Sequence, residues 1–413
     1  MTVVDVAAAG DTVRPTGHRC GGRSARRVAE HAALAAALLA PPEGLTVPLR
    51  ACLGRQLVAP VRARRDMPAF DNSAMDGYAL RFTDLGPTGL PVAGHIPAGA
   101  PLGTLVPGTA QRIMTGAPLP AGADTVVPVE LTDNGRRHVR VDGPIEAGRH
   151  IRRRGEDVRA GETVLSAGIR LGPQHLAAAA ACGVGELHVR RPLRVAVLSA
   201  GSELVGVGED VRPGQTYDSN GTLLVAALGG CGVDVEPLPL VTDRPEDLAA
   251  LLARRLDHFD LLVTSGGISA GDHEVVREVL APGGVDFTAV GLKPGGAQGV
   301  GRYHGIPVIA LPGNPLACWV GFELFVRPAI SALCGVPGRP RLTARSSVAL
   351  RAAPGRVTVV PSTLDVAAGV VSPVRTVGSH SFRALSAADC FVELDATGVA
   401  IAAGDVVPVR RVV

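Results

Sequence analysis

The sequence has little lysine, few aromatic residues and no closely paired cysteines. Phe, Trp and Tyr make up 3% of the chain, which argues against the stacked aromatic surfaces that hold single-stranded nucleic acid. The 7 cysteines are odd in number, and none of them forms a Cys-x-x-Cys pair. This spacing argues against a zinc ribbon and a disulfide framework, and it favours reduced, buried thiols.

The sequence also shows no long apolar run and no strong charge of either sign. We find no stretch long enough to cross a bilayer, and no basic segment followed by an apolar one at the N-terminus. The net charge of +3 on 413 residues points to no polyanionic partner. We therefore expect a cytoplasmic protein without nucleic-acid or membrane partners. The length indicates about two to four domains.

Because lysine is so scarce, the one that is present is informative. Among 41 basic residues the sequence has a single lysine, Lys293, and all the others are arginine. It stands in a glycine-rich turn directly after the strand-like run 285–291. A compact ammonium group at such a turn suits point-charge contact with an anion. The alternative is that compositional drift towards arginine left one lysine by chance. The neighbouring turns are needed to decide between a functional lysine and a chance one.

The first part of the chain predicts a helix and then short strands. Residues 1–23 show no periodicity and are expected to be a disordered leader. Helical spacing follows from Ser24 to Leu39. Short strand-like pieces between Gly and Pro turns fill 47–144 and predict a β module. Residues 24–46 and 145–178 are expected to form a small mixed domain made of two separated pieces.

Continuous apolar strands alternate with amphipathic helices over residues 179–334. This rhythm predicts right-handed βαβ units and a parallel sheet that is covered on both faces. Over 335–413 a β-branched pattern with Gly and Pro turns returns, and it predicts a small β-barrel or sandwich. The expected fold is therefore multidomain, with a parallel-sheet α/β domain, a β module, a mixed segment and a C-terminal barrel.

Glycine-containing turns with small hydroxyl side chains follow the predicted strands of the α/β domain. Ligands of open parallel sheets gather at the carboxyl ends of the strands, where backbone N–H groups and helix N-termini attract anions. A plain tight turn is the alternative for any one of these segments, but all of them fall at one edge. The residues expected to bind a phosphorylated ligand there are Ser199, Gly201, Ser219, Asn220, Ser265, Gly266, Gly267, Ser269, Gly271, Lys293, Pro312, Asn314 and Pro315.

Several carboxylates lie in or beside the same turns. They are Glu203, Asp218, Asp272 and Glu274. Hard oxygen ligands next to a phosphate cradle suit Mg²⁺, which prefers one or two carboxylates together with ligand oxygens and water. Helix capping is the alternative for Asp218 and Asp272, because both stand where an N-cap residue is expected.

A polar loop interrupts the predicted β module at residues 66–79. Its density of polar side chains, including Asp71 and Asp76, suggests a binding loop, and residues 112–118 have the same character. The chain has no Walker A pattern, and no Gly-x-Gly-x-x-Gly follows the first strand of the α/β domain. These two absences argue against a P-loop nucleotide site and a dinucleotide fold. No obvious histidine partner stands ready for a serine nucleophile either.

Taken in order, these segments resemble the molybdopterin molybdenumtransferases, the family of bacterial MoeA and of the E domain of gephyrin. Residues 68–79, Pro-Ala-Phe-Asp-Asn-Ser-Ala-Met-Asp-Gly-Tyr-Ala, are close to that family's signature. The likeness covers the chain from about residue 24 to its C-terminus. The other matching segments are 112–118, 153–157, 217–220, 265–269 and 311–315.

The resemblance implies a homodimer in which the α/β domain of one subunit and the β module of the other share an active site. It also implies that molybdate and adenylylated molybdopterin are the substrates, that Mg²⁺ assists, and that AMP leaves with the mature cofactor. Whether a molybdopterin adenylyltransferase partner delivers the pterin stays open. The implied residues are Asp71, Glu203, Asp218 and Lys293 for catalysis, Glu203, Asp218, Asp272 and Glu274 for metal, and Lys293, Arg356 and Ser379 for molybdate.

Some positions depart from the family's pattern. Gly296 replaces the second lysine of a Lys-Pro-Gly-Lys-Pro motif, and Ala317 replaces a common serine, so two donors to an oxyanion are lost. Ser202 replaces a usual acidic residue, and Glu274 replaces an aspartate. The leading hypothesis is an enzyme that inserts molybdenum in the final step of cofactor biosynthesis. The alternatives are a molybdopterin carrier with a weakened oxyanion site and a generic nucleotide-binding α/β protein.

Overall fold

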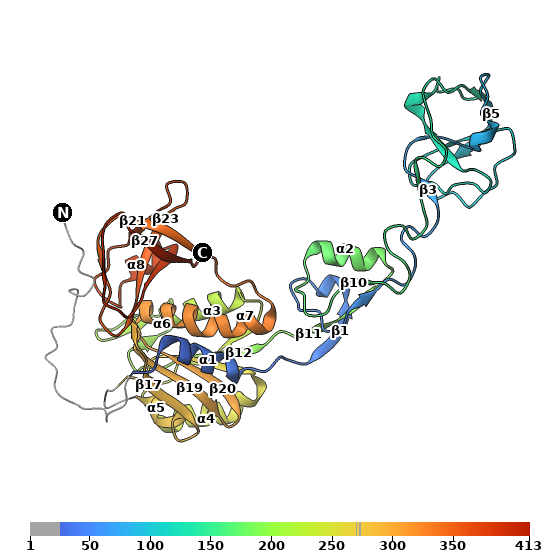
Figure 1. The fold of residues 1–413 in the computed structure, drawn as a ribbon. Helices are drawn as coiled ribbons and strands as arrows, with labels where there is room; N and C mark the ends of the chain where they lie inside the picture. Colours follow the sequence, from blue (N-terminus) through green and yellow to red (C-terminus); the bar gives the residue numbers. More distant parts are fainter. Residues whose placement is uncertain (1–24, 270, 272–273) are drawn as a thin grey trace. The chain divides into compact units, whose positions relative to one another are not determined.

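The chain divides into two compact units (Figure 1). The computed structural model describes residues 25–269, 271 and 274–413, so the predicted leader and Asp272 lie outside the described residues. Unit 1 consists of Met1–Leu45 and Arg190–Val413, and unit 2 of Thr46–Val189.

Unit 1 is built on a 6-stranded sheet in the order β15-β12-β16-β20-β19-β17. The strands β15, β12, β16 and β20 are mutually parallel, as their apolar runs predict. The residues of β12, β16 and β20 are almost all buried, which explains why these strands do not alternate between apolar and polar side chains. The bounds are β12 Arg194–Ser199, β15 Asp234–Pro237, β16 Leu261–Ser265, β17 Val285–Ala289, β19 Ala297–Tyr303 and β20 Ile306–Leu311.

One strand of this sheet, β19, departs from the predicted parallel arrangement. β17 and β19 pair antiparallel, and β19 pairs antiparallel with β20. The linker between β17 and β19, residues 290–296, is too short for a crossover, which needs a dozen residues or more. Because two reversals cancel, β17 runs in the same direction as β20. Its carboxyl end, with Lys293 just beyond it, therefore lies at the edge where the other turns gather.

Helices cover both faces of the sheet, as predicted (Figure 1). One face carries α1, α3, α6 and α7, and the other carries α4 and α5. The helix α1 was expected in the mixed domain, but it contacts α7 and β19 instead. The bounds are α1 Val28–Leu38, α3 Ser219–Gly229, α4 Pro245–Arg255, η4 Leu256–His258, α5 Val275–Leu280, α6 Pro315–Gly321, the π-helical segment η5 Phe322–Val326 and α7 Arg327–Cys334.

The continuous helical stretch Pro315–Cys334 is long and apolar enough to cross a membrane, which the sequence reading overlooked. In the structure 78% of its apolar 18-residue window is buried inside the protein. Phe322 and Phe325 are fully buried in the core that this helix shares with the sheet. The apolar composition is therefore that of a core helix.

The C-terminal part of unit 1 is a closed barrel, which confirms the barrel prediction. Its sheet runs β18-β23-β24-β21-β27-β25, and an additional β23–β25 pairing closes the ring. The short strand β18, Leu292–Lys293, lies parallel to the first residues of β23. The remaining bounds are β21 Arg341–Ser346, β22 Leu350–Arg351, β23 Val357–Asp365, β24 Val370–Pro373, α8 Phe382–Ala387, β25 Cys390–Leu394, β26 Ala400–Ile401 and β27 Val406–Arg411; β13 Leu204–Val205 and β14 Thr216–Tyr217 form a separate pair.

Unit 2 holds the β module and a smaller mixed core. The module is a 5-stranded sheet in the order β7-β4-β6-β5-β8. The mixed core includes Leu57, Leu165 and Val189, so its two pieces differ from those expected. The bounds are β1 Gly44–Pro48, η1 Leu49–Ala51, β2 Val61–Arg62, β3 Asn72–Ser73, β4 Gly77–Leu80, η2 Phe82–Asp84, β5 Leu90–Ile96, β6 Ala110–Ile113, β7 Thr125–Pro128, η3 Val129–Leu131, β8 His138–Val139, β9 Ile151–Arg152, β10 Thr163–Leu165, α2 Pro173–Ala181 and β11 Glu186–Arg190.

Candidate functional site

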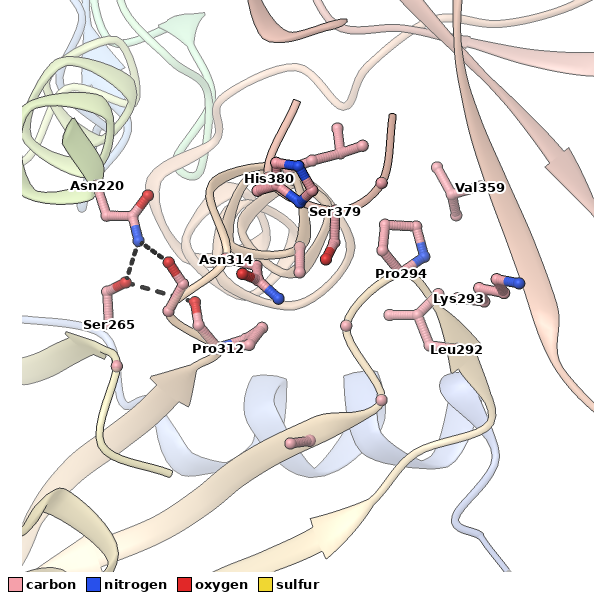
Figure 2. A pocket seen from close by; sticks show the side chains of 18 of the residues that line it. Asn220, Ser265, Leu292, Lys293, Pro294, Pro312, Asn314, Val359, Ser379 and His380 are labelled. Atoms are coloured by element: carbon pink, nitrogen blue, oxygen red, sulfur yellow. Dashed lines mark hydrogen bonds between the residues drawn. The ribbon is translucent and has the colours of Figure 1, made fainter. Parts of the chain in front are cut away.

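A cavity of about 1360 Å³ lies in unit 1 where the sheet edge meets the barrel. Its walls come from the turns after β12, β16 and β20, from the Lys293 turn and from loops of the barrel. Figure 2 shows Asn220 and Ser265 on one side, Lys293 beside Val359 on the other, and Asn314, Ser379 and His380 between them. The cavity thus joins most of the turns that were expected to gather at one rim.

The end of β12 supplies a buried hydroxyl and a carboxylate. Ser199 is 3% exposed and lines the cavity, and its Oγ has no hydrogen-bond partner among the described residues. Gly201 and Glu203 also line it. A Cβ placed on Gly201 would lie 2.3 Å from Oε2 of Glu203, so the absence of a side chain lets this carboxylate fold back over the turn.

Asp243 is a carboxylate of the rim that the sequence reading missed. It lines the cavity, and its Oδ2 accepts a hydrogen bond from the backbone N–H of Ser202 at 3.2 Å. The Ser202 hydroxyl in turn accepts from the backbone N–H of Asp243 at 3.0 Å. The serine that replaces an acidic residue therefore joins two loops. Asp243 reaches the rim because Val241, two residues before it, bridges to Ala200 at the same edge.

The N-terminus of α3 brings a capping carboxylate and a carboxamide to the cavity. Asp218 is the N-cap, and its Oδ1 accepts from the backbone N–H of Gly221 at 2.8 Å. The capping interpretation is therefore right for Asp218, which also lines the cavity. Asn220 lines it too, whereas Ser219 is not among the lining residues.

The turn after β16 depends on glycines that approach other backbone segments closely. Gly266 has φ +87°, and a Cβ at that position would lie 2.4 Å from the carbonyl oxygen of Ala200. Ser265, Gly266, Gly267 and Ser269 all line the cavity. The turn is thus held against the end of β12, where a side chain at residue 266 would not fit.

Glu274 lines the cavity, but both of its carboxylate oxygens accept hydrogen bonds from backbone amides. Its Oε2 accepts from the N–H of Ser269 at 2.6 Å, and its Oε1 from the N–H of Gly271 at 3.3 Å. Gly271 is not among the lining residues. The predicted metal ligand Asp272 lies outside the described residues. In the structure the Glu274 carboxylate holds the backbone amides of Ser269 and Gly271.

The turn that precedes α6 and the turn that contains Lys293 both line the cavity. Pro312 and Asn314 line the cavity, while Pro315, the first residue of α6, does not. Lys293, Gly296 and Ala317 also line it. Gly296 and Ala317 are the two departures from the family's pattern that remove oxyanion donors.

Barrel residues complete the cavity with cationic and hydroxyl groups. Arg356 and Ser379, both expected, line it, and the Ser379 carbonyl accepts from the N–H of Leu316 at 3.0 Å. Arg375 and His380 line it as well and were missed. Nothing in the sequence singles them out, because they stand in an irregular loop. The arginines come from the barrel and the carboxylates from the sheet edge, so the cavity is electrostatically two-sided.

Asp71 is held within unit 2 and not at this cavity. Its Oδ1 accepts from the backbone N–H of Arg154 at 2.8 Å, and its Oδ2 pairs with the Arg153 guanidinium at 2.8 Å. The Arg154 amide, followed by Arg153, lowers the pKa of Asp71 below its usual value. Tyr78 of the same loop is fully buried and donates to the Gly135 carbonyl at 2.9 Å.

The cavity fits a magnesium ion only if the ligand supplies part of the coordination. Within residues 25–269, 271 and 274–413, no three His, Cys, Asp or Glu side chains form a group that could hold a metal. Glu203 and Asp218 both line the cavity, and Mg²⁺ commonly uses one or two carboxylates with phosphate oxygens and water. The donor set therefore suits a metal that arrives with a phosphorylated ligand.

Cys318 lies in α6 behind the cavity and does not act as a nucleophile. Burial raises the pKa of its thiol to about 12, although a hydrogen bond with Ser265 acts in the opposite direction. The side chain is fully buried. A neutral, enclosed thiol has neither the charge nor the access that a nucleophile needs.

Comparison with known proteins covers nearly all of the chain. Residues 26–183 match a model described as the MoeA N-terminal region (domain I and II), 196–332 a probable molybdopterin binding domain, and 343–411 the MoeA C-terminal region (domain IV).

Individual relatives match over most of their own length. The chain is 42% identical to molybdopterin molybdenumtransferase 2 of Mycobacterium tuberculosis, over 92% of this chain and 98% of that protein. It is 35% identical to molybdopterin molybdenumtransferase of Haemophilus influenzae, over 84% and 88%. A crystal structure of a molybdopterin biosynthesis MoeA protein from Pyrococcus horikoshii aligns with TM-score 0.82 and 28% identity, over 94% of this chain and 99% of that one.

Proposed function

This chain belongs to the family of MoeA-type molybdopterin molybdenumtransferases, and from this premise we propose that it inserts molybdenum into adenylylated molybdopterin and releases AMP. This reaction is the final step of molybdenum cofactor biosynthesis. The observation that carries the proposal is the two-sided cavity, which has carboxylates and anion-binding turns on one wall and cations on the other.

The wall formed by the sheet edge suits the pyrophosphate of the substrate. The backbone N–H of Gly267 and the N-terminus of α3 favour phosphate oxygens, whereas the N–H of Gly266 already donates to the Leu311 carbonyl. Glu203 and Asp218 would hold Mg²⁺ there, which when bound supplies positive charge next to the bond that is cleaved. Asp218 is already fixed as a helix cap, so its carboxylate is preorganised for this task.

The wall formed by the barrel suits the oxyanion. Lys293, Arg356 and Ser379 line it and supply two cations and a hydroxyl. We assign molybdate to this side. The pterin dithiolene would then have to reach toward Lys293 while its pyrophosphate stays at the sheet edge.

The loss of two oxyanion donors does not turn the chain into a carrier. Relatives that are named as transferases match it over almost their whole length, and Lys293, Arg356 and Ser379 are retained at the cavity. Gly296 and Ala317 leave space in the cavity wall where the family's pattern has a lysine and a serine. We therefore propose an active enzyme that needs a higher molybdate concentration, and not a binding protein.

We propose that the enzyme works as a cytoplasmic homodimer with shared active sites. Asp71 is ordered by Arg153 and Arg154 in unit 2 and would act on the cavity of the other subunit. A molybdopterin adenylyltransferase is the class of partner that would supply the adenylylated pterin, since that reaction makes the proposed substrate. Complementation between two inactive variants, one altered at Asp71 and one at the cavity, tests the shared site.

AMP release tests the proposed function directly. The purified protein is incubated with adenylylated molybdopterin, Mg²⁺ and a series of molybdate concentrations, and AMP is measured by chromatography. We expect AMP to form in step with mature cofactor, and only when Mg²⁺ and molybdate are both present. Absence of AMP at every molybdate concentration would contradict the enzymatic proposal.

A further inference from the structure

Two buried carboxamide side chains, one lining the cavity and one beneath its wall, share an unusual pattern of hydrogen bonding. Asn220 is 9% exposed and Gln298 is 1% exposed. Each uses its amide nitrogen to donate to a backbone carbonyl of a rim turn. Each leaves its carbonyl oxygen without a partner in the described part of the chain, although that oxygen is buried.

Asn220 joins the start of α3 to two neighbouring turns. Its Nδ2 donates to the Gly313 carbonyl at 2.7 Å and to the Ser265 Oγ at 2.8 Å, as the dashed lines in Figure 2 show. The turns joined in this way also touch each other, because a Cβ on Gly313 would lie 3.3 Å from Cα of Gly266. One side chain thus braces three segments that are far apart in the sequence.

Gln298 performs the same task beneath the Lys293 turn. Its Nε2 donates to the Gly295 carbonyl at 2.8 Å. The side chain reaches back from β19 and lies against α6 at Gly321, where a Cβ would be 3.4 Å from Nε2 and 3.6 Å from Oε1. Since Gln298 is enclosed between the sheet and α6, it has no route to a ligand in the cavity.

The orphan oxygens indicate what these side chains are for. Burying a carbonyl without a partner is destabilising, and an apolar side chain of similar size would avoid that cost. An apolar side chain would lack the N–H donor, however, and each carboxamide uses that donor to hold the backbone carbonyl of one rim turn. We propose that Asn220 and Gln298 are positioning residues that set the Pro312–Asn314 and Lys293–Gly296 turns on either side of Ala317.

The positioning role proposed for Asn220 differs from direct contact with the ligand. Gly313 is held through a backbone carbonyl, which only accepts hydrogen bonds, so the nitrogen of Asn220 must face it. Both N–H groups of the carboxamide are then used within the protein, and neither is left for a phosphate oxygen. Asn220 acts on the ligand through the turn that it holds. The inference relies on the proposed function only for the choice of ligand probes.

Isosteric acids provide a test that a purely structural role would not pass. In Asn220→Asp and Gln298→Glu the donor becomes an oxygen, which repels the carbonyl when ionised and donates to it again when protonated. We expect each variant to bind AMP with Mg²⁺ about tenfold more weakly than wild type at pH 8. Relative to wild type at the same pH, the affinity of Gln298→Glu, whose carboxyl group is enclosed away from the cavity, should recover to within about twofold near pH 5.5. Asn220→Ala and Gln298→Met should show no recovery.

Hydrogen exchange of the ligand-free protein separates this inference from the proposed function. We expect Asn220→Asp at pH 8 to speed exchange in peptides covering 311–318, and Gln298→Glu to speed exchange in peptides covering 293–298. Faster exchange without any AMP release in wild type would uphold the braces and contradict the enzymatic proposal. Unchanged exchange in both variants would overturn the positioning role, whatever the activity. Loss of affinity without pH recovery in Gln298→Glu would also overturn it.

Discussion

Gly295 lies directly against Ala317 in the cavity wall. A Cβ placed on Gly295 would be 3.5 Å from the Cβ of Ala317 and 3.2 Å from its carbonyl oxygen. The two departures that remove oxyanion donors, Gly296 and Ala317, therefore lie close together in one part of the wall. Both side chains are shorter than those they replace, so the loss of donors is local and leaves an enlarged, less polar region beside Lys293.

Restoring both donors should strengthen the use of molybdate. Residue 296 does not have a positive φ, and a Cβ there would approach the carbonyl oxygens of Val290 and Leu292 no closer than 3.4 Å. The backbone and the space around a Cβ therefore permit a side chain at this position, which lines the cavity. We expect Gly296→Lys combined with Ala317→Ser to lower the molybdate concentration for half-maximal AMP release about tenfold, as two added hydrogen bonds to a charged group would.

The control for the added charge is Gly338→Lys. Gly338 also has no positive φ, and a Cβ placed there would meet nothing within 4 Å, but this residue does not line the cavity. This variant should leave the molybdate dependence unchanged. If the double variant behaves like the control, the wall at Gly296 and Ala317 is not the oxyanion site.

Asp218 combines a cap with a free carboxylate oxygen, and two substitutions separate these roles. Asn caps helices as well as Asp does, so Asp218→Asn should keep the thermal midpoint within about a degree while it lowers AMP release at least about a hundredfold. Asp218→Ala should in addition lose about 1 kcal/mol of stability. Equal activity of Asp218→Asn and wild type would show that the carboxylate has only a capping role.

Shared active sites predict complementation between two inactive variants. Asp71→Asn alters a residue of unit 2, and Asp218→Asn alters the cavity of unit 1. When the two are unfolded, mixed in equal amounts and refolded together, half of the dimers should be mixed, and each would carry one intact site. We expect AMP release at about one quarter of the wild-type rate. No recovery, with dimers confirmed by mass, would place Asp71 outside the site.

Gly266 should tolerate no side chain. Gly266→Ala would both strain a φ of +87° and place a Cβ 2.4 Å from the Ala200 carbonyl. Gly214 has a similar φ of +89° with nothing within 4 Å, so Gly214→Ala measures the backbone strain alone. We expect about 1 kcal/mol of destabilisation for Gly214→Ala and clearly more for Gly266→Ala, together with weaker AMP binding. Urea unfolding and titration of AMP with Mg²⁺ measure both effects.

The ion pair between Arg191 and Asp260 should contribute stability that acid removes. The guanidinium donates to both oxygens, at 2.6 and 2.8 Å, and the Arg194 N–H donates at 2.8 Å. Burial by itself raises the pKa of Asp260, but Arg191 and then the Arg194 amide outweigh it, so the pKa is lowered.

The sign of this shift sets the pH range of the effect. Because the folded pKa lies below the unfolded one, the contribution is complete above the unfolded pKa of about 3.9 and is lost as the pH falls through the folded value. We expect Asp260→Asn to lower the urea midpoint at pH 7 and to lose less of it than wild type below about pH 4. Glu246→Gln, at an exposed pair, should change neither. A parallel loss in wild type and Asp260→Asn would contradict the assignment.

The sequence predicted those parts of the fold in which local pattern and burial agree. The apolar runs of β12 and β16, the cap at Asp218 and the closed barrel follow from periodicity and turn chemistry. The strand β19 was missed because Gly299 and Gly301 interrupt its β pattern. Both glycines are required by close packing, since a Cβ at Gly301 would lie 2.4 Å from the Gly284 carbonyl and one at Gly299 would lie 2.6 Å from the Phe287 ring.

The candidate site was predictable to the extent that its residues stand at strand ends. Ser199, Ser265 and Lys293 were found by this rule, and the structure brings all three to one cavity. Asp243 and His380 were not, because one follows a short edge strand and the other stands in an irregular loop. Their position depends on tertiary contacts, such as the reciprocal hydrogen bonds of Ser202 and Asp243, that no local pattern encodes.

The strand β18 ties the single lysine to the barrel as well as to the sheet. Residues 290–296 leave β17, pair at Leu292 and Lys293 with β23, and return as β19. A displacement of the barrel relative to the sheet would therefore also move the Lys293 ammonium group, while the turns after β12, β16 and β20 would stay with the sheet. Under the proposed function, this short piece of continuous main chain would couple the oxyanion side of the cavity to its pyrophosphate side.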